Sequence, residues 1–466
     1  MSFGFGFALP AYPLRGGTGN NPFNQLGPTL DLSFAGVVTD LTDPNGYTLN
    51  TDFIIPQYQI AAQYVVWETG VGLVDKTFSQ IITFTRASTA TYFDSAGVLQ
   101  SAAVDAPRLD YNPSTLAAQG LLIEEARTNL ITSSAALPAG INVTITADTF
   151  VAPDGTTTGD QILDNATLGE HYSDSSFTPV AATNYTFSAF IKNIGALSSG
   201  FACLRLAGDF SAFVIVNLST FAVAVNGGAN FVSSSVQAIN NGWYKISVTG
   251  LSVGTVASVA RIQVTDAANL NLYSGTGEGF AVWGRQLEAG AFPTSYIPTT
   301  TTALTRSADV ASVNTLSPWY SATEGTLYGE ITDAAITVGG TSRRIANIND
   351  GTEADRITVG WAGVTGAFAA FVTDNSVAQA AFSSPSGAYP FPTKVALAYK
   401  AADFQSAVNG NAFATVSSGT VPTVNRMTIG DVVTGGVGPQ NLNGHVRRIT
   451  YYPRKLSSAE LQAITA

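Results

Sequence analysis

The chain has 466 residues, of which only 11% are charged, and its net charge is −11. Soluble proteins average about 25% charged residues, and a nucleic-acid surface needs clustered positive charge, so this composition argues against nucleic acid as a partner. The single cysteine, Cys203, excludes an intrachain disulfide and a cysteine-based zinc site. The low charge and the 45 glycines are typical of short strands joined by polar turns.

Residues 1–80 form a segment of distinct composition. The start, FGFGFALPAYPLRGGTGNNPFNQLGP, is rich in glycine, proline, asparagine and phenylalanine and follows no helical or strand period. Glycine lets the backbone lie close to a partner, and each buried ring would contribute about 25 cal/mol per Å² of apolar surface. We therefore predict an extended N-terminal arm that anchors the chain to another surface through Phe3, Phe5, Phe7 and Phe23.

The same N-terminal start does not have the pattern of an export signal. No cation precedes its apolar run, which Gly4, Gly6 and Pro10 interrupt. No segment of the chain approaches the apolar length that spans a bilayer. We therefore expect synthesis in a cytoplasm and no membrane insertion. Towards the end of the arm, strands are predicted over residues 58–75 and 78–87.

Residues 81–130 are predicted to form a β connector of short runs separated by turns, with residues 94–97 as a hairpin turn. It leads into GLLIEEARTNLITSS, where Glu124 and Glu125 are adjacent. Adjacent side chains point to opposite faces of a strand and do not face each other on a helix. The two carboxylates therefore cannot form one acid–base pair, although each could act with a distant partner. We predict that one of them meets Arg127 or another cation near a module entrance.

Residues 131–300 alternate apolar and polar positions over many short runs. NYTFSAFIKN and GWYKISVTGLS are two examples of this period-two pattern. Alternation over many strands with polar turns is typical of an antiparallel sandwich or jelly roll. We predict such a domain over residues 131–300.

Residues 301–466 form a third block of β runs, which begins in the threonine-rich linker at residues 295–309. The block ends in a short helix, where Ser457 and Glu460 form a capping box. FTRASTA at residues 84–90 and LTRSADVA at residues 304–311 are similar, and each precedes a β module. The predicted fold class is all-β: an extended arm, a β connector, two antiparallel jelly-roll or sandwich domains, and a short C-terminal helix.

The connector, from FTRASTATYFDSAGVLQ to GLLIEEARTNLITSS, closely resembles a segment of tailed-phage virion proteins of the head-spike, head-fibre and tail-fibre types. The block with APDGTTTGDQILDN and VWGRQLEAGAFPTSYIPTT looks like the carbohydrate-binding-like jelly roll that follows it. The ending, NGHVRRITYYPRKLSSAELQAI, is similar to that of concanavalin A/laminin G-like domains. The resemblance covers residues 81–466.

This resemblance implies a structural protein of the phage virion surface, made in the host cytoplasm. The N-terminal arm would bind other virion proteins, and the outer modules would be lectin-like and serve host-surface attachment through a glycan. Fibres and spikes of this class are commonly homotrimers. The chain itself offers no heptad runs that would mark a coiled-coil stalk.

A glycan site needs an aromatic face for the sugar and polar groups for its hydroxyls. The candidates are Tyr172, Trp319, Tyr320 and Trp361, whereas Trp243 and Trp283 lie within strong strand patterns and are expected in the core. A structural calcium could bind Asp164, Asn165, Glu170 and Asp174, although polar turns without an ion have the same composition. No other cofactor is expected.

A glycan-degrading enzyme needs two carboxylates placed across one cleft. The acidic residues of this chain occur singly, and their spacing selects no pair. We therefore expect that the chain is not an enzyme. A glycan-degrading tail spike is the alternative.

Overall fold

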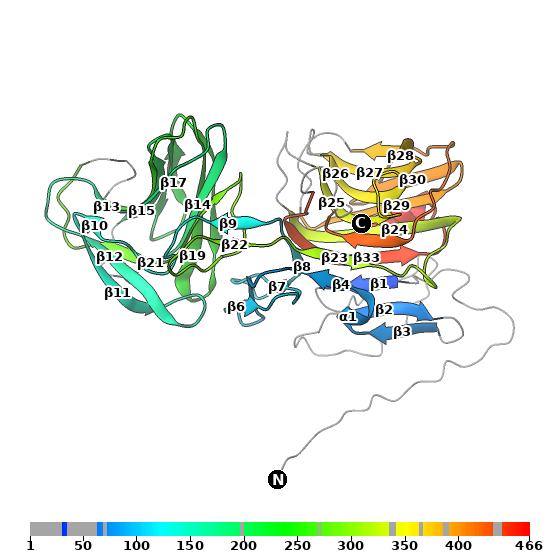
Figure 1. The fold of residues 1–466 in the computed structure, drawn as a ribbon, viewed down its shortest axis with the longest axis horizontal. Helices are drawn as coiled ribbons and strands as arrows, with labels where there is room; N and C mark the ends of the chain where they lie inside the picture. Colours follow the sequence, from blue (N-terminus) through cyan, green and yellow to red (C-terminus); the bar gives the residue numbers. More distant parts are fainter. Residues whose placement is uncertain are drawn as a thin grey trace, which may run out of the picture.

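The computed structural model describes residues 30–34, 63–68, 72–195, 200–266, 268, 270, 272–334, 342–362, 367–384, 391–431 and 440–466. The predicted anchor residues Phe3, Phe5, Phe7 and Phe23 lie outside these ranges. Two β-sandwich modules lie side by side, and the connector runs beneath the point where they meet (Figure 1). The predicted all-β fold class is confirmed.

The jelly-roll module consists of two six-stranded antiparallel sheets. Its core holds the inward-facing positions of both sheets, such as Phe187, Ile246 and Ile262. The predicted period-two alternation therefore corresponds to the inner faces of the sandwich. One sheet has the order β10 (Gly140–Ile141), β13 (His171–Phe177), β20 (Ser258–Thr265), β15 (Phe201–Ala207), β16 (Ser211–Asn217) and β17 (Val223–Gly227). The other has the order β11 (Val143–Val151), β12 (Thr157–Asp164), β21 (Gly279–Ala289), β14 (Asn184–Lys192), β19 (Trp243–Leu251) and β18 (Phe231–Ala238).

The C-terminal module packs a ten-stranded sheet against a seven-stranded sheet. The main path of the larger sheet is β3 (Gly72–Lys76), β2 (Gln63–Glu68), β1 (Leu30–Ser33), β33 (Gly444–Tyr452), β24 (Glu324–Ala334), β29 (Thr393–Lys400), β30 (Asp403–Val408) and β31 (Asn411–Ala412). Off this path, β8 (Ala118–Ile123) pairs with β33 and with β7 (Leu109–Tyr111). The smaller sheet has the order β28 (Val377–Ser383), β27 (Ala367–Asp374), β26 (Arg356–Ala362), β25 (Arg343–Asn349), β32 (Arg426–Ile429), β23 (Val310–Val313) and β4 (Thr83–Thr85).

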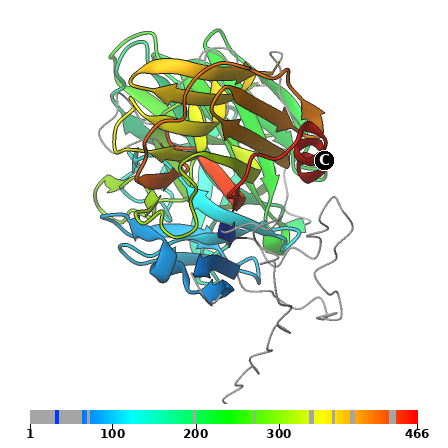
Figure 2. The same cartoon turned by 90° about the vertical axis from the view of Figure 1, so that its right-hand side faces the viewer.

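Strands from the predicted arm and connector therefore extend both sheets of the C-terminal module. Strand β1 lies between β2 and β33, and Leu30, Leu32 and Phe34 are buried in the core of this module. Figure 2 shows the N-terminal strands along one side of the sandwich. The connector also contributes the hairpin β5 (Ala90–Phe93)–β6 (Leu99–Ala102), as predicted around residues 94–97. A ribbon of β9 (Arg127–Asn129) and β22 (Leu304–Arg306) links the two modules.

The described chain has two α-helices. Helix α2 (Ser458–Thr465) begins at the predicted capping box of Ser457 and Glu460. Helix α1 (Phe78–Ile81) corrects the strand prediction for residues 78–87, of which only β4 is extended. The reason is local, because Thr77 and Gln80 form a second capping box that stabilises one helical turn. No helix of the described ranges is long and apolar enough to cross a membrane.

Candidate functional site

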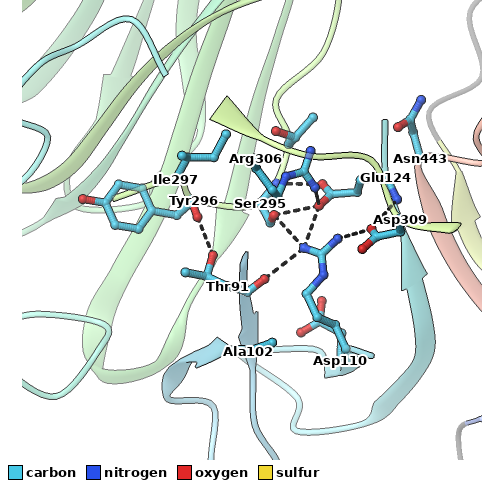
Figure 3. Close-up of polar contacts among 12 residues, drawn as sticks. Thr91, Ala102, Asp110, Glu124, Ser295, Tyr296, Ile297, Arg306, Asp309 and Asn443 are labelled. Carbon is cyan, nitrogen blue, oxygen red and sulfur yellow. Dashed lines mark hydrogen bonds and ion pairs between the residues drawn. The ribbon is translucent and has the colours of Figure 1, made fainter. Parts of the chain in front are cut away.

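Five charged side chains meet in a buried cluster where the connector joins the two modules. Arg86 Nη1 lies 3.1 Å from Asp309 Oδ1, and Arg108 Nη1 lies 2.7 Å from Glu124 Oε2. Arg108 also pairs with Asp309, and Arg306 pairs with Glu124. We call Arg86, Arg108, Glu124, Arg306 and Asp309 the charge cluster, and Figure 3 shows the contacts around Glu124, Arg306 and Asp309. All five side chains are almost fully enclosed.

Backbone amides of the connector and of the jelly-roll module also enter the charge cluster. The Glu124 amide donates to Asp309 Oδ2 at 2.9 Å, and both the amide and hydroxyl of Ser295 donate to the Glu124 carboxylate. Burial alone would raise the pKa of Glu124, but Arg306 and Arg108 outweigh it, so the pKa lies below its usual range. Burial would likewise lower the pKa of Arg108, and Asp309 and Glu124 reverse that effect. Glu124 and Arg108 thus stay ionised in the interior because each has charged partners.

Glu125 has different partners from Glu124. Its carboxylate lies 2.5 Å from Arg127 Nη2 and 3.3 Å from Arg343 Nη1, and it accepts a hydrogen bond from Asn443. The prediction that a carboxylate of this pair meets Arg127 or another cation at a module entrance is confirmed. Gly290 packs against Arg127, and its φ of +147° together with the lack of a side chain leaves the space that the guanidinium occupies.

His445 connects the connector to the C-terminal module through two carboxylates. Its Nε2 lies 2.8 Å from Asp110 Oδ2, and its Nδ1 lies 2.6 Å from Asp333 Oδ1. Burial would lower the pKa of His445, but the charges and hydrogen bonds of Asp333 and Asp110 raise it to about 10. His445 therefore carries a positive charge at neutral pH and donates from both ring nitrogens.

A cavity of about 480 Å³ opens beside the charge cluster, and we call it the junction cavity. Its floor is the outer face of the sheet that contains β14, β18 and β19, where Gln237 pairs in register with Lys245 and Lys245 with Phe190. Its walls come from the connector, from residues 292–296 and from the C-terminal module, which contributes Asp333 and His445. A site with apolar walls and a few polar groups, at a junction between domains, is where small ligands commonly bind.

The sequence-predicted aromatic residues do not gather in one place. Trp319 and Trp361 are only 2% and 1% exposed and belong to the core of the C-terminal module, so neither offers a ring face to a sugar. Tyr320 is partly buried against the same core. Tyr172 lies on the outer face of the jelly roll, where the Arg261 guanidinium sits 3.4 Å from its ring centre.

The four predicted calcium ligands are held by other partners. Asp164 Oδ1 accepts hydrogen bonds from three successive amides, Thr276 to Glu278, and Asn165 Oδ1 accepts one from Thr167. Glu170 and Asp174 both pair with Arg261. Among the described residues, no group of three or more histidine, cysteine or acidic side chains has the geometry to hold a metal ion. Calcium at these positions stays a prediction.

The charge cluster and the junction cavity were not predicted as a site. Arg86 and Arg306 occupy the same position in the two similar segments FTRASTA and LTRSADVA, and both arginines enter the charge cluster. The repeated segment was therefore the sequence signal that could have indicated the charge cluster. The pairing itself joins residues such as Arg86 and Asp309, which are 223 positions apart, and local sequence patterns contain no information on such a contact.

Several solved structures are similar to parts of this chain, but with low TM-scores. No protein-family model matches the chain, and no curated protein matches it. The CBM40 domain of Ruminococcus gnavus IT-sialidase is 18% identical, covers 31% of this chain and 84% of its own, and has a TM-score of 0.26. The LG1-3 region of the laminin α2 chain is 10% identical over 62% of this chain and 66% of its own, with a TM-score of 0.22.

A Trypanosoma rangeli sialidase in complex with sialic acid is also similar, with 10% identity, coverage of 66% of this chain and 60% of its own, and a TM-score of 0.25. This finding contradicts the expectation that the chain is not an enzyme, because a sialidase is among the similar structures. We withdraw that exclusion. Likenesses at these scores carry no argument about the ligand, reaction or partners of this chain.

Proposed function

We propose that the chain is a structural protein of a tailed-phage virion surface, of the fibre, spike or decoration type. Its two lectin-like modules would attach the particle to a glycan of the host surface. The proposal rests on the resemblance of the connector, and one structural observation supports it most. The charged residues of that connector, Arg86, Arg108 and Glu124, form the charge cluster with Arg306 and Asp309.

The charge cluster suits such a role because it ties the connector to residues 306–309, which precede the C-terminal module, and to Ser295 of the jelly roll, without a disulfide. Each of its ion pairs is withdrawn from water, so separating the connector from residues 306–309 would expose or unpair several charges at once. An attachment protein outside the cell needs this kind of persistent geometry. The N-terminal arm would join other virion proteins, and the chain would be made in the host cytoplasm.

Competition with intact particles tests this function. Purified chain added to host cells should occupy the glycan and reduce adsorption of the phage whose genome encodes it. Heat-unfolded chain at the same concentration is the control. Unchanged adsorption in the presence of saturating folded chain, together with no binding of the chain to the cells, would contradict the attachment role.

A further inference from the structure

We propose that the junction cavity binds the end of a neutral, hydroxyl-rich oligosaccharide that carries no carboxylate. This inference rests on the proposed attachment function and names the site and the class of glycan. The volume of the junction cavity, about 480 Å³, is within the roughly 300–1,000 Å³ that is usual for small-molecule sites. Ser235 and Gln237 line the cavity and are exposed, so a ligand can enter past β18.

The cavity offers hydrogen-bond capacity that the protein itself leaves unused. Lys245 Nζ donates to the Thr294 carbonyl at 2.6 Å, and within the described ranges it has no carboxylate at ion-pair distance. An ammonium group has three N–H donors, so two of them can serve hydroxyl oxygens of a ligand. Asp333, whose side chain is 46% exposed, uses Oδ1 for His445 and can accept hydroxyl protons through Oδ2.

Aromatic walls complement these polar groups. Phe93 and Phe292 line the cavity and are both half-buried, so each presents part of its ring. Phe292 is held in place by the guanidinium of Arg127, whose Cζ lies 4.8 Å from the ring centre. Sugar rings have apolar C–H faces as well as hydroxyls, and they fit a site that combines aromatic walls with a few polar groups.

The charges around the cavity are balanced, which favours a neutral ligand over an acidic one. Lys245 and His445 face Asp110 and Asp333, and both ring nitrogens of His445 are already taken by these two carboxylates. Glu124 also lines the cavity, but Arg108 and Arg306 neutralise it. Within the described ranges Lys245 lacks a carboxylate partner, but a ligand carboxylate drawn to it would enter a lining that also holds the exposed carboxylate of Asp333, which would repel it.

A blocking substitution at the mouth tests the proposal with a matched control. Gln237→Trp places a large ring over the entrance, while Ser233→Trp puts the same ring on the same face of β18, four residues away and outside the cavity lining. On a glycan array of neutral bacterial oligosaccharides and their carboxylated counterparts, wild type and Ser233→Trp should bind neutral glycans. Gln237→Trp should lose that binding while melting at the wild-type temperature.

A second variant reports on the chemistry within the site. Lys245→Met keeps an unbranched side chain that is one atom shorter and removes its donors, so affinity for the neutral glycan should fall roughly tenfold. Equal binding by Gln237→Trp and wild type, or binding confined to carboxylated glycans, would overturn this inference while leaving the attachment function standing. Failure of the wild type to bind any glycan, on the array or on host cells, would overturn the attachment function first.

Discussion

Adjacent residues in this chain serve separate contacts, and Glu124 and Glu125 are the clearest case. Glu124 enters the charge cluster with Arg108 and Arg306, whereas Glu125 meets Arg127 and Arg343. The alternation of side chains along an extended chain predicts this separation from sequence alone. The identity of the distant partners could not be predicted, because it depends on how the modules pack.

Removing one member of the charge cluster should be costly. Asp309→Ala leaves Arg86 and Arg108 without one of their carboxylates in a site closed to water, so the free energy of unfolding should fall by about 3–5 kcal/mol. Urea unfolding followed by tryptophan fluorescence measures this loss. Lys400→Ala removes an exposed pair with Glu324 and should cost no more than about 1 kcal/mol. Equal losses for the two variants would show that the cluster does not hold the modules.

The raised pKa of His445 predicts a specific pH dependence of stability. A histidine whose pKa rises from 6.5 in the unfolded chain to about 10 in the folded chain stabilises the fold fully below pH 6.5. This contribution is lost as the pH rises towards 10. The melting temperature of the wild type should therefore fall more steeply between pH 6.5 and pH 10 than that of His445→Asn. The same pH dependence of the melting temperature in the two proteins would contradict the pairing of His445 with Asp110 and Asp333.

At the scale of elements, local chemistry predicted helices and turns better than it predicted which strands pair. The capping box at Ser457 correctly predicted helix α2, and residues 94–97 correctly predicted the turn between β5 and β6. The capping box at Thr77 has the same chemistry and was missed, because the β-rich sequence that follows it suggested a strand. The pairing of β1 with β33 joins positions more than 400 residues apart, which no local pattern encodes.

Strand β1 should be essential to the C-terminal module, whereas the residues before it should not. Strands β2 and β3 reach the large sheet only through β1, and Leu30 and Leu32 are completely buried. Deleting residues 2–34 should therefore lower the melting temperature and expose the edge of β33. Deletion of residues 2–25 is the matched control and should leave a folded, soluble protein. The same melting temperature for both truncations would show that β1 contributes no stability.

At the scale of the whole molecule, the connector acts as a joint between two sandwiches rather than as a spacer. It supplies strands to the C-terminal module, covers the outer face of a jelly-roll sheet and supplies three members of the charge cluster. The all-β class and the two modules could be predicted from the period-two pattern. The positions of the aromatic candidates could not be predicted. Tryptophan is a residue type that stacks on sugars, but Trp319 and Trp361 are buried in the core of the C-terminal module.

The proposed role also predicts an assembly. Closed cyclic symmetry is usual for homo-oligomers, and the resemblance to spike and fibre proteins favours three copies. Mass photometry of the purified chain should give a trimer of a 48.4 kDa subunit. A stable monomer at micromolar concentration would contradict the trimer.

We propose that this chain projects two rigidly joined β-sandwich modules from the surface of a phage particle. A cryo-EM map of intact particles of the phage that encodes it tests this claim most directly. We predict density at the particle surface into which both modules fit as one body, joined at the charge cluster, with the N-terminal arm directed into the particle. Particles without density for the chain, or modules that occupy variable relative positions, would contradict it.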